Sequence, residues 1–447
     1  MRVSVVGLGR LGSPLAAVLA HAGHDVTGID RGADIVDAIN EGRSPVAEPG
    51  VADLLGRARG RLRATTDVAA VAASDATFIV VPTPSLPSGR FSNTMVIEAL
   101  TAVGGALRGT EAYHVVAVTS TVAPTSMDAE IRPALERASG RSVGSSIGLC
   151  YNPQFIALGS VVRDLTRPDL VLIGESDARA GAVVEALQRS FVDGRSQVRR
   201  MSCINAEITK LAVNTYVTTK ISYANMLAEI CERLPGADVD VVTGALGMDR
   251  RIGASYLKGA LGYGGPCFPR DNAALAAVAA GAGANPALAV ATDAMNRYQL
   301  ARLAELVRAH TSEHANRVGV LGLSYKTDTH VVDESPGLLL ANRLANGGLP
   351  VSVFDPAAND EARPQLDASI AIASSTAACL DRSDVVVVTV PWTDFQQIPE
   401  LLRARPRPAL VIIDCWRLLD RSSVEGLARL VHIGRASADT AVGAEIR

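Results

Sequence analysis

The chain has 447 residues, a length that predicts two or three domains. It is 48% hydrophobic and 20% charged with a formal net charge of −3, which is typical of an ordinary globular protein and argues against a nucleic-acid-binding one. Because no uninterrupted apolar run reaches about 18 residues, we expect no membrane-spanning helix.

The N-terminal third begins with the pattern of a dinucleotide-binding unit. Gly7, Gly9 and Gly12 form G-x-G-x-x-G directly after the apolar run Val3–Val6. In such a unit the first glycine permits a sharp turn, the second lets the backbone approach a pyrophosphate, and the third lets the next helix pack closely. Asp30 ends the second apolar run, where a carboxylate accepts both ribose hydroxyls of NAD and repels the extra phosphate of NADP. We therefore expect NAD as the cofactor.

Other residues of this unit are further candidates for ligand contacts. Leu11 lies within the glycine turn, and Arg31 next to Asp30 is a residue type that softens the discrimination against NADP. Thr83 and Thr121 follow the apolar runs FIVV and HVVAV, so we expect them at strand ends, where ligands bind in a doubly wound sheet. Each hydroxyl either contacts the nicotinamide or a sugar, or caps the next turn.

The rest of the chain predicts a long helix and then a second sheet. Residues 205–234 have a helical pattern without proline until Pro235. From Arg317 onward, apolar strands alternate with helices again, but the first turn holds only Gly322, so we expect no second dinucleotide. The predicted fold class is α/β, with two Rossmann-like doubly wound domains joined by a long central helix and a small helical domain. The expected domains are 1–198, 199–300 and 301–447.

Lysine is rare in this chain and marks candidate functional positions. Of the 43 basic residues all but four are arginines, and the four lysines are Lys210, Lys220, Lys258 and Lys326. An arginine cannot give up its proton, so lysine is needed where a compact, titratable ammonium is required. Lys210 lies four residues before Asn214, which places an amine and a carboxamide on one helical face.

The segment LGYGGPCFPRD is the most specific local pattern. Cys267 precedes Pro269 by two residues, and proline favours the first position of a helix. A thiol at a helix N-terminus is stabilised as the thiolate, and Asp271 in the first turn can fix a water or hold Lys210. The alternative is a small buried cysteine in a glycine-rich turn. Three glycines allow a ligand to approach the backbone closely: Gly262, Gly264 and Gly265.

The other five cysteines are scattered, with no CxxC pair and no His/Cys cluster. This spacing predicts neither a metal site nor a disulfide framework, and a reducing cytoplasm fits it best. The N-terminus runs directly into the glycine turn, so we expect no signal peptide.

A cysteine nucleophile beside NAD predicts a particular chemistry. An alcohol is oxidised to an aldehyde, thiolate addition gives a thiohemiacetal, and a second oxidation gives a thioester that water cleaves to an acid. Lys210 and Asn214 would hold the oxygen as its negative charge develops, as the donors of an oxyanion hole do.

These motifs together resemble the UDP-glucose/GDP-mannose dehydrogenase family, in order and over essentially the whole chain. The matching segments are GLGRLG, EPG at 48–50, STV at 120–122, YNPQF, EITKLAVNT, RIG at 251–253, GYGGPCFPRD and GLSYKTDT. The resemblance implies a UDP-glucose 6-dehydrogenase-like enzyme with an N-terminal NAD domain, a central dimerisation domain and a C-terminal domain for the nucleotide of the sugar. It also implies a homodimer, with no nucleic-acid or membrane partner.

Roles carried over by position are implied by this resemblance. Cys267 is the nucleophile, Lys210 and Asn214 stabilise oxyanions, Asp271 assists with the water, and Thr121 lies near the reacting groups. Arg251 reaches the sugar in the neighbouring subunit, so one active site needs two chains. Lys326 matches both cofactor- and substrate-binding positions, and the other residues lining the nucleotide-sugar site are Phe155, Tyr256, Leu257 and Gly264.

The chain departs from the family pattern at four positions. Gln154 replaces the glutamate of NPEF, and an amide orients a water but cannot remove its proton. Leu158 stands where a second acid is often found, and Arg270 replaces the lysine after the proline. Asp333 stands where many members have an arginine, which puts a cofactor or interface contact in doubt.

Four readings of the function remain open from the sequence. The first is a nucleotide-sugar 6-dehydrogenase that makes a uronic acid. The second is an altered member in which Gln154 and Leu158 impair thioester hydrolysis, so that it releases an aldehyde or acts on an unusual nucleotide sugar. The third is a non-catalytic nucleotide-sugar-binding subunit, and the fourth a simple hydroxyacid dehydrogenase, which would leave Cys267 without a role.

Overall fold

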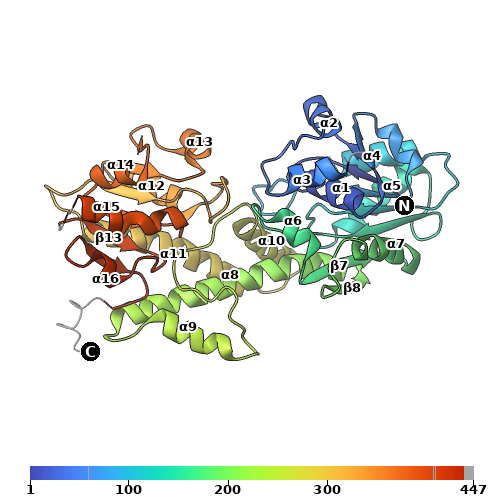
Figure 1. The fold of residues 1–447 in the computed structure, drawn as a ribbon. Coiled ribbons are helices and arrows are strands. Elements are labelled where there is room, and N and C mark those ends of the chain that lie inside the picture. The colour runs from blue at the N-terminus through green and yellow to red at the C-terminus, as the bar shows by residue number, and fades with distance from the viewer. Residues whose placement is uncertain (59, 406, 408, 437–447) are drawn as a thin grey trace. The chain divides into compact units, whose positions relative to one another are not determined.

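The computed structural model describes residues 1–58, 60–405, 407 and 409–436. The chain forms two compact units, Met1–Val213 and Asn214–Arg447 (Figure 1). The end of the expected third domain, residues 437–447, lies outside the described residues.

The first unit is built on an eight-stranded sheet in the order β3-β2-β1-β4-β5-β6-β7-β8. The first six strands have the order of a doubly wound dinucleotide-binding sheet, and all of their neighbouring pairs are parallel. Strand β7 pairs antiparallel with β6 and parallel with β8. The strands are β1 (Arg2–Val6), β2 (Asp25–Ile29), β3 (Leu62–Thr65), β4 (Ala76–Ile79), β5 (His114–Val118), β6 (Ile147–Tyr151), β7 (Leu170–Glu175) and β8 (Gln197–Ser202).

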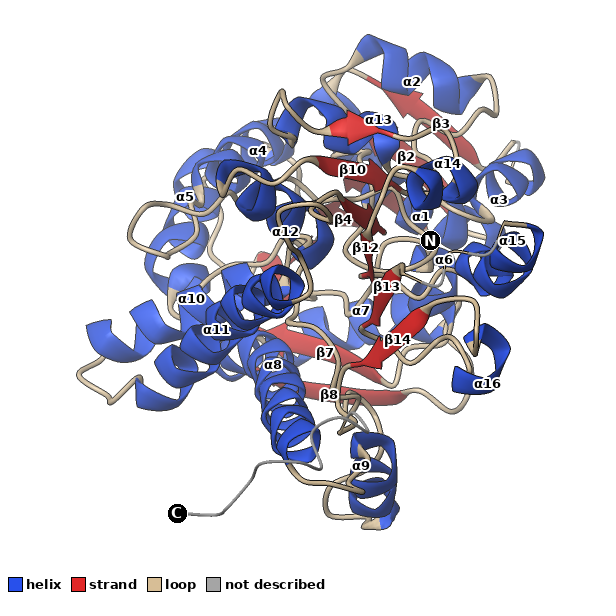
Figure 2. Ribbon diagram, turned by 90° about the vertical axis from the view of Figure 1, so that its left-hand side faces the viewer, coloured by secondary structure: helices blue, strands red, loops and turns tan. Residues whose placement is uncertain are grey.

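The central strands of this sheet are buried on both faces. Every residue of β4, β5 and β6 is buried, which explains why these strands are nearly continuous apolar runs. Helices cover the sheet (Figure 2). They are α1 (Gly12–His21), α2 (Ala33–Asn40), α3 (Val51–Arg57), α4 (Thr94–Leu107), α5 (Arg132–Ser139), α6 (Val161–Thr166) and α7 (Ala178–Arg189), with a 3₁₀ turn η1 (Val68–Ala73) and a π turn η2 (Met127–Ile131).

Helix α8 (Cys203–Arg233) crosses the boundary of the two units as one continuous helix of 31 residues. The predicted helix over 205–234 is confirmed to within two residues. Of the helices in the described parts of the chain, none combines the length and the hydropathy that a membrane span requires.

The second unit contains a six-stranded, all-parallel sheet in the order β11-β10-β9-β12-β13-β14. This is again the doubly wound order, so the predicted fold class of two Rossmann-like sheets with a long helix and a small helical region is confirmed. The strands are β9 (Val318–Leu321), β10 (Val351–Phe354), β11 (Ala371–Ile372), β12 (Val385–Val388), β13 (Val411–Asp414) and β14 (Arg429–His432).

Helices precede this second sheet and also cover it. The first three form the helical region: α9 (Val239–Met248), α10 (Phe268–Gly281) and α11 (Ala287–Ala309). The others are α12 (Pro336–Asn346), α13 (Asn359–Ala362), α14 (Thr376–Asp381), α15 (Ile398–Ala404) and α16 (Arg421–Val424), with 3₁₀ turns η3 (Arg363–Gln365) and η4 (Thr393–Gln397).

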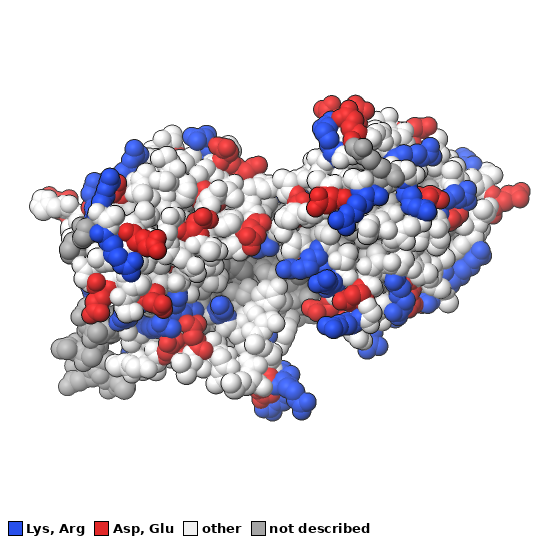
Figure 3. All heavy atoms as spheres, in the orientation of Figure 1, with Lys and Arg blue, Asp and Glu red and all other residues white. Residues whose placement is uncertain are grey.

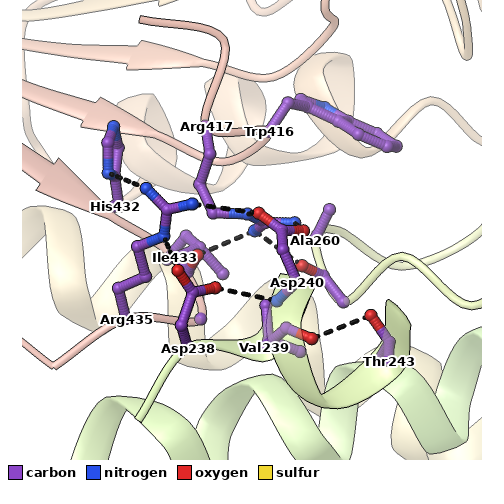
Figure 4. A network of polar contacts seen from close by, with 12 residues as sticks. Asp238, Val239, Asp240, Thr243, Ala260, Trp416, Arg417, His432, Ile433 and Arg435 are labelled. Carbon is purple, nitrogen blue, oxygen red and sulfur yellow. Dashed lines mark hydrogen bonds and ion pairs between the residues drawn. The ribbon is translucent and has the colours of Figure 1, made fainter. Parts of the chain in front are cut away.

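Arg417 fastens helix α9 to the last strands of the second sheet (Figure 4). Its guanidinium, whose side chain is 2% exposed, donates to both carboxylate oxygens of Asp240 at 2.7 and 2.9 Å. The same group donates to the carbonyls of Gly259 and Ile433 at 2.7 and 2.8 Å. Arg435 adds a second ion pair to Asp240 at 3.2 Å. The bidentate geometry and the burial make this an ordered connection between segments far apart in the sequence.

Basic and acidic side chains are interspersed on the face drawn in Figure 3. This distribution agrees with the small net charge of the chain, −3.

Candidate active site

The turn after β1 has the geometry that a pyrophosphate requires. Gly7 adopts φ +91°, and a Cβ there would overlap the carbonyl of Val80. A Cβ on Gly12 would overlap the carbonyl of Gly7, so helix α1 packs against the turn only because this residue has no side chain. By contrast, no atom lies within 4 Å of a Cβ built on Gly9. The middle glycine thus leaves the backbone open to a ligand, and Leu11 directly precedes α1 as its N-cap residue.

Asp30 follows β2 at the same end of the sheet. One carboxylate oxygen accepts from the backbone N–H of Leu8 at 2.7 Å and the other from that of Gly32 at 2.9 Å. The carboxylate is only partly buried, and each oxygen retains a lone pair for a ribose hydroxyl. Together with the open backbone at Gly9, this arrangement fits NAD. Arg31 is exposed beside it.

The loops after β4 and β5 are tied together at this edge of the sheet. The Thr83 hydroxyl donates to the carbonyl of Thr121 at 2.7 Å, and the Ser120 hydroxyl donates to the carbonyl of Val81 at 2.6 Å. The structure therefore brings Thr83 and Thr121 together. The Thr83 hydroxyl thus forms a hydrogen bond with the backbone of the neighbouring loop. This resembles the capping of a turn, one of the two roles that the sequence left open for this hydroxyl.

Lys210 of α8 contacts the segment after β6. Its ammonium donates to the carbonyl of Gln154 at 2.7 Å and lies 4.4 Å from the centre of the Phe155 ring. Three of the expected site residues thus meet within the first unit, although Lys210 lies 56 positions after Gln154 in the sequence.

The side chain of Gln154 acts as a hydrogen-bond donor. Its Nε2 donates to the backbone carbonyl of Asn152 at 3.2 Å and to the side-chain Oδ1 of the same residue at 3.1 Å. Asn152 is fully buried, and Gln188 donates to the same Oδ1 at 2.6 Å. A glutamate at position 154 would turn a carboxylate toward two acceptors, so the local network suits an amide. Leu158 packs against the apolar core of this unit.

Cys267 is the N-cap residue of α10 and is exposed. The alternative of a buried structural cysteine is therefore wrong, and the expected position at a helix N-terminus is confirmed. Pro269 is the second residue of the helix rather than the first, because the helix begins at Phe268. Cys267 thus lies at the N-terminus of a helix of 14 residues, the end at which the helix dipole is positive.

Packing within the protein accounts for the three glycines before Cys267. A Cβ on Gly262 would overlap the side chain of Asn296, and one on Gly264 would overlap the carbonyl of Glu334. Gly265, at φ +84°, packs against the Tyr325 ring. The N–H of Gly265 donates to the carbonyl of Asp333 at 2.9 Å. Within the second unit, Asp333 therefore supports the cysteine loop through its backbone carbonyl.

Asn214 and Asp271 form a hydrogen-bonded pair in the second unit, in which Asp271 is buried and Asn214 is partly buried. The Asn214 amide donates to Oδ2 of Asp271 at 2.6 Å, and the guanidinium of Arg270 lies 3.5 Å from the other oxygen. The sequence left open whether Asp271 fixes a water or holds Lys210. In the structure, the side chain of Asp271 accepts a hydrogen bond from Asn214.

The remaining candidates lie on loops of the second unit. Arg251 is 89% exposed along its side chain and pairs with Asp249, while Lys220 holds the same loop by donating to two of its carbonyls. Tyr256 is exposed at φ +63°, and Leu257 beside it is buried. Lys326 is partly buried in the segment after β9, 5.9 Å from the centre of the Tyr325 ring.

Asp355 shows why the second sheet has no open dinucleotide site. It follows β10 as Asp30 follows β2, but it is fully buried and accepts from the backbone N–H groups of Leu323 and Ser324 at 2.7 and 2.9 Å. The indole of Trp392 donates to the same oxygen at 3.2 Å. This carboxylate is saturated by the protein and has no capacity left for a ribose.

Glu207 is a residue that the sequence reasoning missed. It lies in EITK, three residues before Lys210 and on the same helical face. That spacing is the feature of the sequence that could have identified it.

Among the described residues, no group of three His, Cys, Asp or Glu could hold a metal ion.

Comparison with known proteins gives matches along the whole chain. The family models of the UDP-glucose/GDP-mannose dehydrogenase family match residues 1–192 as the NAD binding domain, 204–298 as the central domain and 319–421 as the UDP binding domain. The resemblance is thus confirmed, and with it NAD as the cofactor.

Individual relatives agree with these models. The UDP-glucose 6-dehydrogenase AglM of Haloferax volcanii is 36% identical over 96% of this chain and 99% of its own length. The GDP-mannose 6-dehydrogenase of Pseudomonas putida is 34% identical, over 79% of this chain and 81% of its own. A UDP-glucose dehydrogenase structure from Pyrobaculum islandicum superposes with a TM-score of 0.87 at 33% identity, covering 97% of this chain and 98% of that one. The chain therefore belongs to the UDP-glucose/GDP-mannose dehydrogenase family of NAD-dependent oxidoreductases acting on CH–OH groups.

Proposed function

We propose that this chain is a UDP-glucose 6-dehydrogenase-like enzyme that oxidises the C6 alcohol of a nucleotide-bound sugar to a carboxylate through a covalent adduct on Cys267. The observation that carries the proposal is the exposed thiol at the N-terminus of α10, in the same unit as the hydrogen-bonded Asn214–Asp271 pair. The preference for UDP-glucose rests on the relatives from Haloferax volcanii and Pyrobaculum islandicum, which carry that name.

The chemistry proceeds in three stages. The C6 alcohol loses a proton and a hydride to become an aldehyde, and the Cys267 thiolate then adds to the carbonyl carbon to give a thiohemiacetal. Loss of a second hydride yields a thioester, and water cleaves its C–S bond to release the carboxylate and return the thiol. Both oxidations need a hydride acceptor, which is the chemistry that NAD supplies when held by the glycine turn and Asp30.

Lys210 and Asn214 stabilise the oxygen on which negative charge develops. They lie one turn apart on α8, and preorganised donors of this kind lower the barrier by more than a solvent-exposed charge does. Asp271 orients the Asn214 amide and assists with the hydrolytic water, while Thr121 and Gln154 flank the reacting groups. Phe155, Tyr256, Leu257, Gly264 and Lys326 line the nucleotide-sugar site.

A homodimer completes this proposal. Tyr216, Tyr223 and Ile230 are exposed on α8 at seven-residue intervals, which places them on one face of the helix. Val241 and Met248 repeat the same spacing on α9. Exposed apolar surface of this extent is typical of a protein interface, and a second copy of the chain is the occupant that we propose. Arg251 then reaches the sugar bound by the partner.

The test is to count NADH and acid from purified protein supplied with NAD and UDP-glucose, with GDP-mannose in parallel. We expect two NADH per molecule of acid, and no acid from Cys267→Ala. Cys415→Ala is the matched control, because that thiol is fully buried in the second unit. Full acid formation by Cys267→Ala would refute the thioester route. The hydroxyacid dehydrogenase reading predicts instead that Cys267→Ala leaves the rate of NADH formation unchanged. The absence of turnover with any nucleotide sugar would favour the non-catalytic subunit.

The second candidate is an enzyme with slow hydrolysis, and the donor role of Gln154 favours it. An amide that donates to Asn152 supplies no base for the attacking water. Acid quenching followed by mass spectrometry should then show a thioester on Cys267 during turnover. Faster acid release by Gln154→Glu would identify hydrolysis as the impaired step, whereas an unacylated enzyme at steady state would eliminate this candidate. A cytoplasmic location suits both candidates, since the thiol must stay reduced.

A further inference from the structure

Glu207 joins helix α8 to the loop that follows Thr121. The side chain is 1% exposed, and its two carboxylate oxygens accept from the backbone N–H of Thr125 at 2.9 Å and from that of Met127 at 2.8 Å. Both hydrogen bonds lie within the first unit. The side chain of Glu207 thus connects the loop to α8 through two hydrogen bonds.

The loop has an unusual backbone conformation where it contacts Glu207. Thr125 adopts φ +80°, a conformation that is unfavourable for a β-branched residue and persists only where the surroundings impose it. The π turn η2 begins two residues later, at Met127. A carboxylate can accept a hydrogen bond from a backbone N–H at each of its two oxygens. A carboxamide has only one acceptor oxygen, so its NH₂ group would face one of the two backbone N–H groups and repel it.

The position of Glu207 on α8 links the loop to the ammonium of Lys210. The two residues are three apart and share one helical face, and Lys210 in turn donates to the carbonyl of Gln154. Thr121 lies four residues before Thr125 on the bound loop. One carboxylate therefore fixes the loop that carries Thr121 to the helix that carries Lys210.

We propose, building on the function proposed above, that Glu207 is a positioning residue whose carboxyl group sets the placement of the Thr121 loop relative to Lys210. Burial of the carboxyl group in the closed loop favours its protonated form, so ionisation weakens the attachment of the loop. The carboxylate therefore couples the geometry of this half of the active site to pH, a property that a purely structural contact between apolar groups would not have.

The surroundings of Glu207 support a response near neutral pH. Burial raises the pKa of Glu207 to about 7. The hydrogen bonds from the backbone N–H groups lower this pKa, and the negative charge of Asp128 raises it further. Asp128 is itself paired with Arg132 at 2.9 Å. Cys203, one turn earlier on α8, has its pKa raised by burial to about 12, so it stays neutral while the carboxyl titrates.

The experiment combines hydrogen exchange with kinetics on the full chain. For Glu207→Gln we expect faster amide exchange in peptides covering residues 122–131 and a fall in kcat on the order of 10- to 100-fold, with a smaller change in the KM for NAD. Glu207→Asp keeps the charge and should retain the pH dependence of the wild type. Glu136→Gln is the matched control, since Glu136 also accepts from a backbone N–H, that of Val143 at 2.9 Å, in the same unit.

Wild-type protein supplies the readout that needs no variant. After correction for intrinsic rates, the 122–131 peptides should exchange faster at pH 8 than at pH 6, relative to peptides around Val143, because the closed loop binds the Glu207 proton more tightly than the open loop does. Equal protection at the two pH values would overturn the proposal, and so would a Glu207→Gln variant with wild-type kcat and protection. Failure of the proposed function shows itself differently, as a wild type without turnover, and leaves the exchange measurement intact.

Discussion

The side-chain amide of Asn214 donates a 2.6 Å hydrogen bond to the carboxylate of Asp271, which is itself 1% exposed. This bond uses one of the two N–H groups of the amide and fixes the direction of the other. A buried carboxylate with a short, charge-assisted bond holds its partner more rigidly than a neutral acceptor would. The pair is thus suited to presenting a single aligned donor.

Removing the amide should therefore affect both turnover and stability. We expect Asn214→Ala to lower kcat on the order of 10²–10³-fold, because an aligned donor to the developing oxyanion is lost. The carboxylate of Asp271 would lose its amide partner, which destabilises the fold by about 1–3 kcal/mol. Steady-state kinetics and urea unfolding measure the two effects. Asn342→Ala is the control, since Asn342 also donates from its side chain within the second unit, to Gln365. Equal kcat in both variants would argue against the oxyanion role.

Asp30 should determine the choice of cofactor. Asp30→Ala removes an acceptor for the ribose hydroxyls, so we expect kcat/KM for NAD to fall on the order of 10- to 100-fold. The ratio of NADP to NAD activity should rise, since the carboxylate no longer repels a phosphate and Arg31 remains. Rates with both cofactors give this ratio, and Asp67→Ala, which removes an exposed carboxylate after β3, should leave it unchanged. An unaltered ratio in Asp30→Ala would contradict the assignment.

The proposed dimer can be tested by complementation. Tyr216→Arg together with Tyr223→Arg should give a monomer by light scattering, because two charges would be placed on the exposed face of α8. If Arg251 serves the partner's site, a mixture of the inactive variants Arg251→Ala and Cys267→Ala should regain activity. With equal amounts and free exchange of subunits, roughly a quarter of the wild-type rate is expected, since half of the dimers carry one complete site. A mixture that stays inactive after proven exchange would place Arg251 in its own subunit's site or outside the site.

Buried His114 should make the stability of the first unit fall in acid. Burial lowers the pKa of His114 to about 4, and its ring nitrogens contact the Thr77 hydroxyl at 2.8 Å and the Ser74 carbonyl at 3.0 Å. Because the folded pKa lies below the unfolded value of 6.5, the unfolded state binds more protons between pH 6.5 and pH 4. Stability is therefore retained above pH 6.5 and decreases as the pH falls through this window, by up to about 3 kcal/mol.

A comparison of the wild type with His114→Gln isolates this effect from other titrations. The difference in urea midpoint between the two proteins should be largest at pH 7.5 and shrink toward pH 4.5. A difference that stays constant over this range would show that His114 does not control the acid response.

The sequence predicted the parts of the fold that depend on local patterns. The glycine turn, the strand ends at Thr83 and Thr121, and helix α8 were all recognisable because each needs a particular residue type or period. Strands β6, β7 and β8 were not identified. The pairing of β6 with β7 is antiparallel and has no motif, and β8, the edge strand QVRRMS, is largely polar.

The candidate site likewise has features that the local sequence predicts and contacts that it does not. Cys267 at a helix start could be inferred from its neighbours in the chain. The contact of Lys210 with Gln154, and that of Glu207 with Thr125, join segments 56 and 82 residues apart, so they depend on tertiary folding. The glycines around Cys267 illustrate the same limit, because only the fold shows that Tyr325 and Glu334 occupy the space beside them.

The two sheets also indicate how such a scaffold could be re-engineered. Inserting the missing glycines after β9 would not by itself give the second sheet a dinucleotide pocket, because the acid after β10 is sealed beneath the indole of Trp392. A designer would first have to cut that ring back and free the carboxylate from its amide neighbours. Such a change would sacrifice part of the domain's interior to make room for a second coenzyme.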